Sequence, residues 1–375
     1  MISTVEYAEG FKLPSKNDIM EALGPFNVDE EQLLYSNCPS NSWKPIPPID
    51  FEGDWLANYA EPGEAFSEYV QLSYKELKTL KKEVVIGNDS ILYFLPIVKK
   101  GSEWPIHYPS LESLSSWISS FFQRKVVLLD YGTVELVIPS SIDESIIDFQ
   151  SLQNNTSKLI LGRHHYSSKH TQIHTSGLLK ELKKNVKELK NAFALVAITC
   201  EDLISGDTSE NCLFTAGMAS MTGGVAVLSF FRYHPQIRMS PDVWHKYHYE
   251  NNCSNYPFII EEKKTNTNKF TALEASDPKL KSINEKFKTE FLRRAAKIIA
   301  HETCHVLSMQ HCIYYHCIMN GTGHLAEDFA SPSFLSLLHL SEEAAVPPGV
   351  RCNGQIFPSG HHTEELQGIE GCIMV

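Results

Sequence analysis

The chain has 375 residues, of which 42% are hydrophobic and 10% aromatic, and this composition excludes generic disorder. Its 33 Lys and Arg residues against 45 Asp and Glu residues give a formal net charge of −12, so we expect no nucleic-acid partner, because phosphate contact needs a concentrated basic face. No apolar run approaches the ~20 residues that span a bilayer, and the first residues lack the basic-then-apolar order of a secretory signal. We expect a soluble intracellular protein, cytoplasmic, with the nucleus as an alternative.

The cysteines indicate free thiols or metal ligands rather than disulfides. There are nine, an odd number with dispersed spacing, which is not typical of a disulfide framework. Three of them fall between Cys304 and Cys317, where histidines are also dense.

The first half of the chain alternates short apolar runs with amphipathic segments. Residues 1–50, rich in Pro, Asn and Ser, predict an N-terminal arm packed on the surface. Apolar runs at 91–97 and 125–130 predict strands on either side of a helix at 111–122. A helix at 181–192 and a strand at 193–199 follow, and the alternation favours an α/β layer with a mostly parallel sheet.

The second half ends in one long helix. Residues 225–231 predict another strand, and the polar stretch 232–275 predicts a long excursion with little structure of its own. The helix begins near 276–278 and continues through 291–307, where apolar residues recur at helical spacing and predict one buried face.

The sequence His301-Glu302-Thr303-Cys304-His305 is an HExxH motif on this helix. Residues four apart lie on one helical face, so both imidazoles can bind one ion. Glu302 is rotated by about 100° from His301, which places its carboxylate beside the open metal position. There it can take a proton from a zinc-bound water.

A third histidine follows at a distance that requires the helix to stop and the chain to turn back. His311 would complete a three-histidine zinc site with a fourth position open for water, which is the arrangement of catalytic zinc. Cys312, Cys317 and Met319 come directly after it.

The segment HETCHVLSMQHCIYYHCIM (301–319) resembles the signature of the archaemetzincin family of metallopeptidases, which places Cys after the third zinc His, a second Cys five residues later, and a Met two residues after that. Further segments that look like family segments are DWLANY (54–59), HTQIH (170–174), FALVAITCEDL (193–203), AGMASMTGGVAVLSFFRY (216–233) and MNGTGHLAED (319–328). The resemblance covers roughly residues 50–345.

The resemblance implies an α+β zincin fold, a twisted mixed sheet with two long helices over a small C-terminal subdomain. Residues 51–345 would form this metzincin-like catalytic domain, with the active-site helix at about 280–307 and a C-terminal tail at 346–375. The strand at 225–231 would be the edge strand above a substrate cleft and offer its backbone to an extended peptide. Met319 would form the Met-turn beneath the zinc.

The sequence departs from the family pattern at two places. Ser308 stands where the family has Gly, at a turn that favours a positive φ and costs a residue with a Cβ roughly 1–2 kcal/mol. Leu337 and Leu340 stand where the family has a second Cys pair, which with Cys312 and Cys317 would bind a structural zinc. Two thiolates are half a tetrahedral site, so we expect one catalytic zinc and no structural zinc. Possible replacement ligands are His339, Cys352, His361 and His362.

Other histidines and the last cysteine have plainer interpretations. Four clustered histidines are expected to be solvated, with a second metal site as the alternative: His164, His165, His170 and His174. His324 and Glu327 lie where another zincin class has a carboxylate ligand, but His311 has the better context. The final Cys372-Ile373-Met374-Val375 has the form of a prenylation box, yet Val is unusual at its end and no basic patch precedes it, so we expect no membrane association.

The sequence therefore predicts a monomeric zinc metallopeptidase that acts on a peptide or protein substrate. His301, His305 and His311 would bind zinc, and Glu302 would be the general base and then the general acid. The alternative, motivated by Ser308 and the missing Cys pair, is a zinc-binding module that holds peptides with little or no catalysis.

Overall fold

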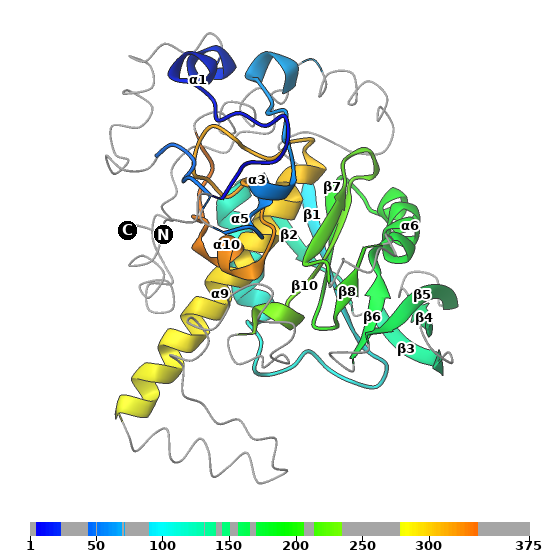
Figure 1. Cartoon of the computed structure of the whole chain (residues 1–375). Coiled ribbons are helices and arrows are strands. Elements are labelled where there is room, and N and C mark those ends of the chain that lie inside the picture. Colours follow the sequence, from blue (N-terminus) through cyan, green and yellow to red (C-terminus); the bar gives the residue numbers. More distant parts are fainter. Residues whose placement is uncertain are drawn as a thin grey trace.

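The structure is a computed structural model, and its central feature is a ten-stranded mixed sheet with helices on both faces (Figure 1). The residues that it describes are 5–23, 44–49, 51–69, 71, 90–130, 132–139, 145–150, 157–165, 170–205, 214–234 and 278–336.

The centre of the sheet is parallel. Strand β1 (Ile91–Lys99) pairs with β7 (Ala192–Thr199) along one side, and with β2 (Lys125–Leu128) and then β3 (Gly132–Pro139) along the other. Strand β10 (Val225–Ser229) continues the parallel order beyond β7. Every residue of β7 is buried, because helices cover both faces of the sheet here and a continuous apolar run suits that position.

The far half of the sheet is antiparallel, which the expectation of a mostly parallel sheet did not include. Strands β4 (Ser145–Gln150), β5 (Ser157–His165) and β6 (His170–His174) extend the sheet from β3 as an antiparallel series. The short β8 (Leu203–Ile204) pairs with β6 in parallel.

The prediction that residues 225–231 form the edge strand is wrong. Strand β10 lies between β7 and a further strand, β9 (Gly217–Ser220), which is antiparallel to β10 and ends the sheet. A 3₁₀ turn, η2 (Met221–Gly223), and Gly224 at φ +63° reverse the chain between the two strands. Glycine adopts this left-handed conformation without the Cβ penalty, so the chain folds back as a hairpin and β9 takes the edge.

The helices that flank the sheet bury a separate core on each face. Helices α5 (Leu111–Phe122) and α9 (Pro278–Val306) pack on one face, and α6 (Thr175–Asn185) with the 3₁₀ turn η1 (Val186–Glu188) packs on the other (Figure 1). The Ser110 side chain caps α5 by accepting a hydrogen bond from the Ser113 amide. The expected fold class, a mixed sheet with two long helices over it, is confirmed.

The smaller elements gather around the C-terminal half of α9 and the loop that follows it. These are α1 (Lys16–Leu23), α3 (Trp55–Asn58), the 3₁₀ turn η3 (Phe231–Tyr233) and α10 (Leu325–Ala330). The arm expected at 1–50 is described in part: Pro45 forms a β-bridge with Tyr315, so this stretch lies against the C-terminal region.

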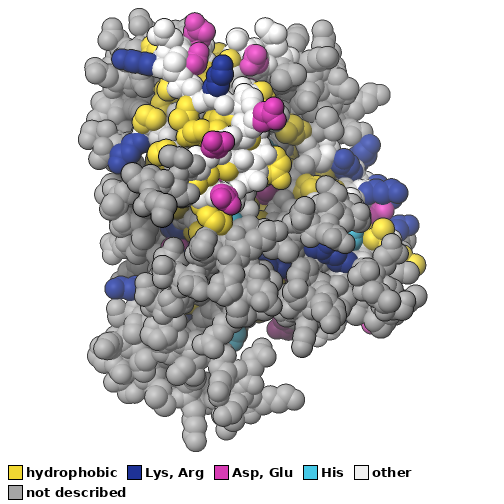
Figure 2. All heavy atoms as spheres, in the orientation of Figure 1, with side chains coloured by type: hydrophobic (Ala, Val, Ile, Leu, Met, Phe, Trp, Pro, Cys, Tyr) yellow, Lys and Arg dark blue, Asp and Glu magenta, His cyan; other side chains and the backbone are white. Residues whose placement is uncertain are grey.

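The surface around this end is mixed in character. On the face shown in Figure 2, hydrophobic side chains gather in the upper part with acidic side chains among them. Among the described residues, no helix has both the length and the hydropathy needed to cross a membrane. The expected boundaries at residues 50 and 345 stay predictions, and the C-terminal tail, with Cys372, lies outside the described residues.

Candidate metal centre

The HExxH motif lies in the last two turns of α9, where the helix is held firmly by the core. Phe291, Ala295 and Ile299 of this helix are at most 1% exposed, as the helical spacing predicts. The N-terminal end of α9 extends away from the body of the protein in Figure 1, so it is the C-terminal half that carries the site.

Helix α9 stops directly after the motif because the backbone turns left-handed at Ser308. Ser308 has φ +68°, one of three non-glycine residues with a positive φ in the described chain. The amides of Leu307 and Met309 both donate to the Cys304 carbonyl, at 2.9 and 3.2 Å, which closes the last turn. The expected turn is therefore present with serine in place of glycine, and it returns the chain toward the helix.

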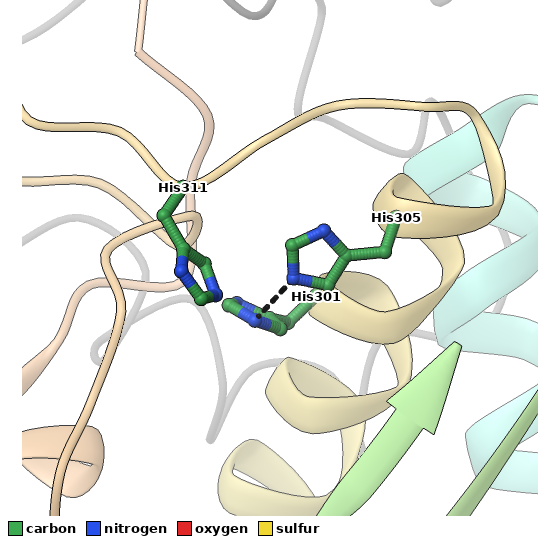
Figure 3. Close-up of side chains that lie close together, drawn as sticks. All are labelled: His301, His305 and His311. Atoms are coloured by element: carbon green, nitrogen blue, oxygen red, sulfur yellow. Dashed lines mark hydrogen bonds between the residues drawn. The ribbon is translucent and has the colours of Figure 1, made fainter. Parts of the chain in front are cut away.

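This turn brings the third histidine to the other two. His301 and His305 project from α9 and His311 from the loop, with all three rings pointing toward one another (Figure 3). One nitrogen atom from each ring lies within 4.8 Å of the others. The ring centroids are 4.7 to 5.5 Å apart.

Each histidine is oriented by a hydrogen bond from its Nδ1 atom. The acceptors are the Ile318 carbonyl oxygen at 2.8 Å from His301, the Met309 carbonyl oxygen at 2.7 Å from His305, and Glu61 Oε1 at 2.8 Å from His311. These acceptors place the proton on Nδ1 in the neutral ring and leave the Nε2 lone pairs directed inward.

The inward Nε2 atoms fit a cation. His305 Nε2 and His301 Nε2 are 3.1 Å apart, the contact that is dashed in Figure 3. Burial lowers the pKa of His301 to about 4, so this ring is neutral near pH 7. Two lone pairs that face each other at this distance repel unless a positive ion or a proton lies between them. Three imidazoles whose outer nitrogens are anchored by hydrogen bonds are the donor set that Zn²⁺ prefers.

Glu302 lies beside this set and against the edge of the sheet. It is 6% exposed, and burial, followed by the negative charge of Asp328, raises its pKa to about 8. A Cβ atom at Gly217 of β9 would lie 2.6 Å from Glu302 Oε1, so the strand passes this carboxylate more closely than a residue with a Cβ atom would allow. Glu302 therefore occupies the space between α9 and β9.

The loop with Met319 packs against the histidines. The Ile318 carbonyl that orients His301 comes one residue before Met319, whose side chain is fully buried. The Met319 carbonyl accepts from the Cys312 amide at 2.8 Å, and Asn320 bonds the Cys312 carbonyl at 2.9 Å. The predicted Met-turn role of Met319 stays a prediction, but the loop is tied to the residue that follows His311.

Cys312 and Cys317 are buried together. Burial, followed by a hydrogen bond with Cys312, raises the pKa of the Cys317 thiol. Cys312 Sγ lies 3.8 Å from the Ser336 hydroxyl. Leu337, Leu340 and the possible replacement ligands His339, Cys352, His361 and His362 lie outside the described residues.

A buried ion pair supports the motif from one turn below. Lys297, four residues before His301, is 1% exposed and lies 2.9 Å from Asp328 Oδ1. The Tyr233 hydroxyl donates to the other Asp328 oxygen. This pairing compensates the buried charges and links α9, η3 and α10.

His324 and Glu327 form a separate cluster with Asp54. His324 Nε2 lies 2.8 Å from Asp54 Oδ1, and the Glu327 amide donates to His324 Nδ1. The Glu327 carboxylate accepts from the amides of Trp55 and Gly323. Backbone amides thus occupy this cluster's acceptors, and it fits a structural junction better than a metal site.

The four clustered histidines lie on the paired strands β5 and β6, and the expectation that they are solvated is wrong for His174, while the side chains of His164, His165 and His170 lie outside the described residues. His164 and His165 pair through the backbone with Thr171 and His170. His174 is buried at the start of α6.

Sequence reasoning did not single out Glu61, although it orients His311. Glu61 is 250 positions from its partner, and no spacing rule connects residues so far apart. The only hint was the segment 54–59, which was noted for its resemblance alone.

Comparison with known proteins finds archaemetzincins among the relatives of this chain. No family model matches the chain. It is 26% identical over 329 residues to archaemetzincin-2 of Mus musculus, covering 85% of this chain and 76% of that one, and 25% identical over 320 residues to archaemetzincin-2 of Homo sapiens, covering 84% and 74%.

Two solved structures overlap the chain at low similarity. They are an archaemetzincin from Methanopyrus kandleri, at 18% identity and TM-score 0.35 over 69% of this chain and 96% of that one, and a zinc-dependent peptidase from Methanocorpusculum labreanum, at 14% identity and TM-score 0.35 over 67% and 99%. At this similarity they support no residue-by-residue comparison of the sites.

Proposed function

This chain belongs to the archaemetzincin family, and from that premise we propose that it is a zinc-dependent metallopeptidase. His301, His305 and His311 hold the zinc in this proposal, and Glu302 is the general base and acid. The observation that carries it is the convergence of three Nε2 atoms whose Nδ1 atoms are already hydrogen bonded, beside a buried carboxylate.

In this proposal Glu302 transfers the proton during hydrolysis, and the three histidines hold the zinc. Zinc, when bound, lowers the pKa of a coordinated water to about 7 and polarises the scissile carbonyl. The positive charge of a bound zinc ion would offset the burial that raises the pKa of Glu302, so its carboxylate would take the proton from the attacking water and then deliver it to the leaving amide nitrogen. Histidine binds zinc as the neutral imidazole, so each of the three rings would present an unprotonated Nε2 atom to the metal.

The substrate in this proposal is a peptide bound in extended form along β9. Strand β9 ends the sheet in the described part of the chain, and it passes Glu302 at Gly217. A peptide that pairs with this edge has its backbone fixed by main-chain hydrogen bonds. Its scissile bond then lies near Glu302. The protein acts as a monomer in the cytoplasm in the same proposal.

The alternative, a zinc-binding module that holds peptides without cleaving them, is motivated by Ser308. A backbone strained at the turn before His311 could displace a ligand by the ångström that matters for rate. The intact Glu302 favours the enzyme, since a site that only binds has no need of this carboxylate.

Replacement of Glu302 by Gln tests the proposal. We expect Glu302→Gln to keep the zinc content of the native chain and to lose peptide hydrolysis by a factor of 10² or more, because the amide cannot accept the proton. Glu285→Gln, at an exposed position of the same helix, is the matched control and should retain activity. Zinc content by elemental mass spectrometry and cleavage of a peptide library are the two measurements.

Two outcomes would contradict the proposal. Undiminished hydrolysis by the Glu302→Gln variant would remove Glu302 from this role. Zinc-loaded native chain that binds library peptides without cleaving any would favour the binding module.

A further inference from the structure

We propose that Glu61, held by Trp55, is a positioning residue that orients His311 and strengthens its bond to the metal. The inference rests on the proposed function, because it assigns a role toward the zinc. It adds a group from the N-terminal region to a site that the sequence places wholly within 301–319.

Two donors converge on one oxygen of Glu61. His311 Nδ1 lies 2.8 Å from Glu61 Oε1, and Trp55 Nε1 lies 2.6 Å from the same atom. The Glu61 side chain is 19% exposed and that of His311 is 21%, so the pair is partly shielded from water.

His311 differs from the other two histidines in what holds it. His301 and His305 project from a packed helix, and backbone carbonyl groups accept their Nδ1 protons. His311 lies in the loop beyond the helix, and its acceptor is a side chain 250 positions away. A carboxylate is also a stronger acceptor than a carbonyl group and makes the imidazole a more basic ligand.

Trp55 is itself fixed in place, so it can hold Glu61. Its amide donates to Glu327 of α10 at 3.0 Å, and its ring meets the His311 ring edge-on at 5.2 Å between centroids. A Cβ atom at Gly321 would lie 2.4 Å from Trp55 Nε1, so the indole lies tightly against the loop that follows Met319. A series of hydrogen bonds thus connects α10 to the proposed ligand, from Glu327 through Trp55 and Glu61 to His311.

The test compares zinc affinity in variants of the full chain, by competition with a chromogenic chelator. We expect Glu61→Gln to weaken zinc binding about tenfold, because the amide oxygen still accepts both hydrogen bonds but carries no charge. Glu61→Ala should weaken it by about 100-fold, because the ring also loses its orientation. Trp55→Phe, which keeps the ring and removes the N–H, should have an effect no larger than Glu61→Gln.

Glu52→Gln is the matched control. Glu52 is exposed on the same segment, three residues before Trp55, and we expect its variant to bind zinc within a factor of two of the native chain.

A second readout separates orientation from general destabilisation. In the chain loaded with Co²⁺, we expect Glu61→Ala to change the visible absorption of the bound ion, while Glu61→Gln keeps the native band positions. Far-ultraviolet circular dichroism of the metal-free variants checks that they are folded. A role in stability alone would lower the unfolding temperature of the metal-free chain and leave the cobalt spectrum of the folded protein unchanged.

The result that would overturn the inference is native zinc affinity in a folded Glu61→Ala variant. Because affinity and spectrum are read on the metal alone, the test does not depend on hydrolysis. A native chain that binds zinc tightly but cleaves nothing would contradict the proposed function and still allow the role of Glu61 to be measured. A native chain that binds no zinc would overturn both.

Discussion

Gly217 is the residue of β9 that sets how closely the sheet edge approaches Glu302. A Cβ atom there would lie 2.6 to 2.7 Å from three atoms of the Glu302 side chain, and Glu302 is too deeply buried to swing clear. We expect Gly217→Ala to displace the carboxylate and lower the hydrolysis rate roughly 10²-fold, while zinc content stays unchanged. Rates on a cleaved peptide and zinc analysis would measure this. Ser220→Ala, on the same strand, should retain native activity, and an equally active Gly217→Ala variant would disprove the positional argument.

Ser308 carries a strain that a pair of variants can isolate. Its φ of +68° costs a residue with a Cβ about 1–2 kcal/mol, whereas glycine adds conformational freedom to the unfolded chain worth about 0.4–1 kcal/mol. Both Ser308→Gly and Ser308→Ala lose the hydroxyl, so their difference in stability reports the strain of the Cβ less the unfolded-state freedom that glycine adds. We expect the glycine variant to be more stable than the alanine variant by about 1 kcal/mol in urea unfolding. An alanine variant more stable than the glycine variant by about 0.4–1 kcal/mol would show that the turn is not strained.

The residues of the proposed site could be predicted as far as local spacing determines them. His301, Glu302 and His305 share one helical turn, and His311 follows within one loop, so their proximity depends on short-range geometry. Glu61 and Trp55 could not be predicted, because their approach depends on how a segment 250 positions away packs. A spacing rule contains no information on such tertiary contacts.

At the scale of elements, helices and strands with strong periodicity were predicted well, whereas a short strand without it was missed. Helix α5 runs from Leu111 to Phe122, the limits that its amphipathic pattern predicted. Strand β9 was missed because GMAS has neither an apolar run nor clear alternation, and the reversal at Gly224 decides its place. The predicted edge strand was wrong for this reason alone. Strand β10 is as apolar as expected, but a neighbour covers its outer side.

The element η3 ends beside a histidine that makes stability depend on pH. His234 packs edge-on against Phe287 and Phe291 of α9 and tilts against Tyr108. Burial, followed by the charge of His107, lowers the pKa of His234 to about 4. The unfolded chain, with a pKa near 6.5, binds the proton more readily, so stability is full above pH 6.5 and falls as the pH drops toward 4.

Replacing this histidine should reduce the acid loss. We expect His234→Phe to keep near-native stability at pH 7.5 and to lose roughly 2 kcal/mol less than the native chain between pH 7 and 4.5. Urea unfolding at a series of pH values measures the difference. His107→Gln removes the smaller cause and should keep most of the native slope. Parallel curves for the native and His234→Phe chains would assign the pH dependence to other groups.

At the scale of the whole molecule, the proposed site is assembled from two distant parts of the chain. Tyr69 donates its hydroxyl to the Leu307 carbonyl at 3.0 Å, and Glu64 accepts from the Gln310 amide at 3.1 Å. The Lys44 carbonyl accepts from the His316 amide at 2.9 Å. Residues 44–69 thus brace the turn, the third histidine and the loop after it. The sequence predicted an N-terminal arm on the surface but not that this region would support the site.

The number of zinc ions per chain tests how this assembly departs from the family pattern. The three histidines form a complete donor set. Cys312, in contrast, lies near Ser336, and leucines stand in this chain where the family has its second Cys pair. We expect the purified chain to contain one zinc by elemental mass spectrometry, and chelation to lower its unfolding temperature, because the ion binds only the folded state. The double variant Cys312→Ser/Cys317→Ser should still contain one zinc, and His311→Ala should bind it much more weakly. Two zinc ions in the native chain and one in the double variant would instead show that ligands such as His339 or Cys352 complete a second site.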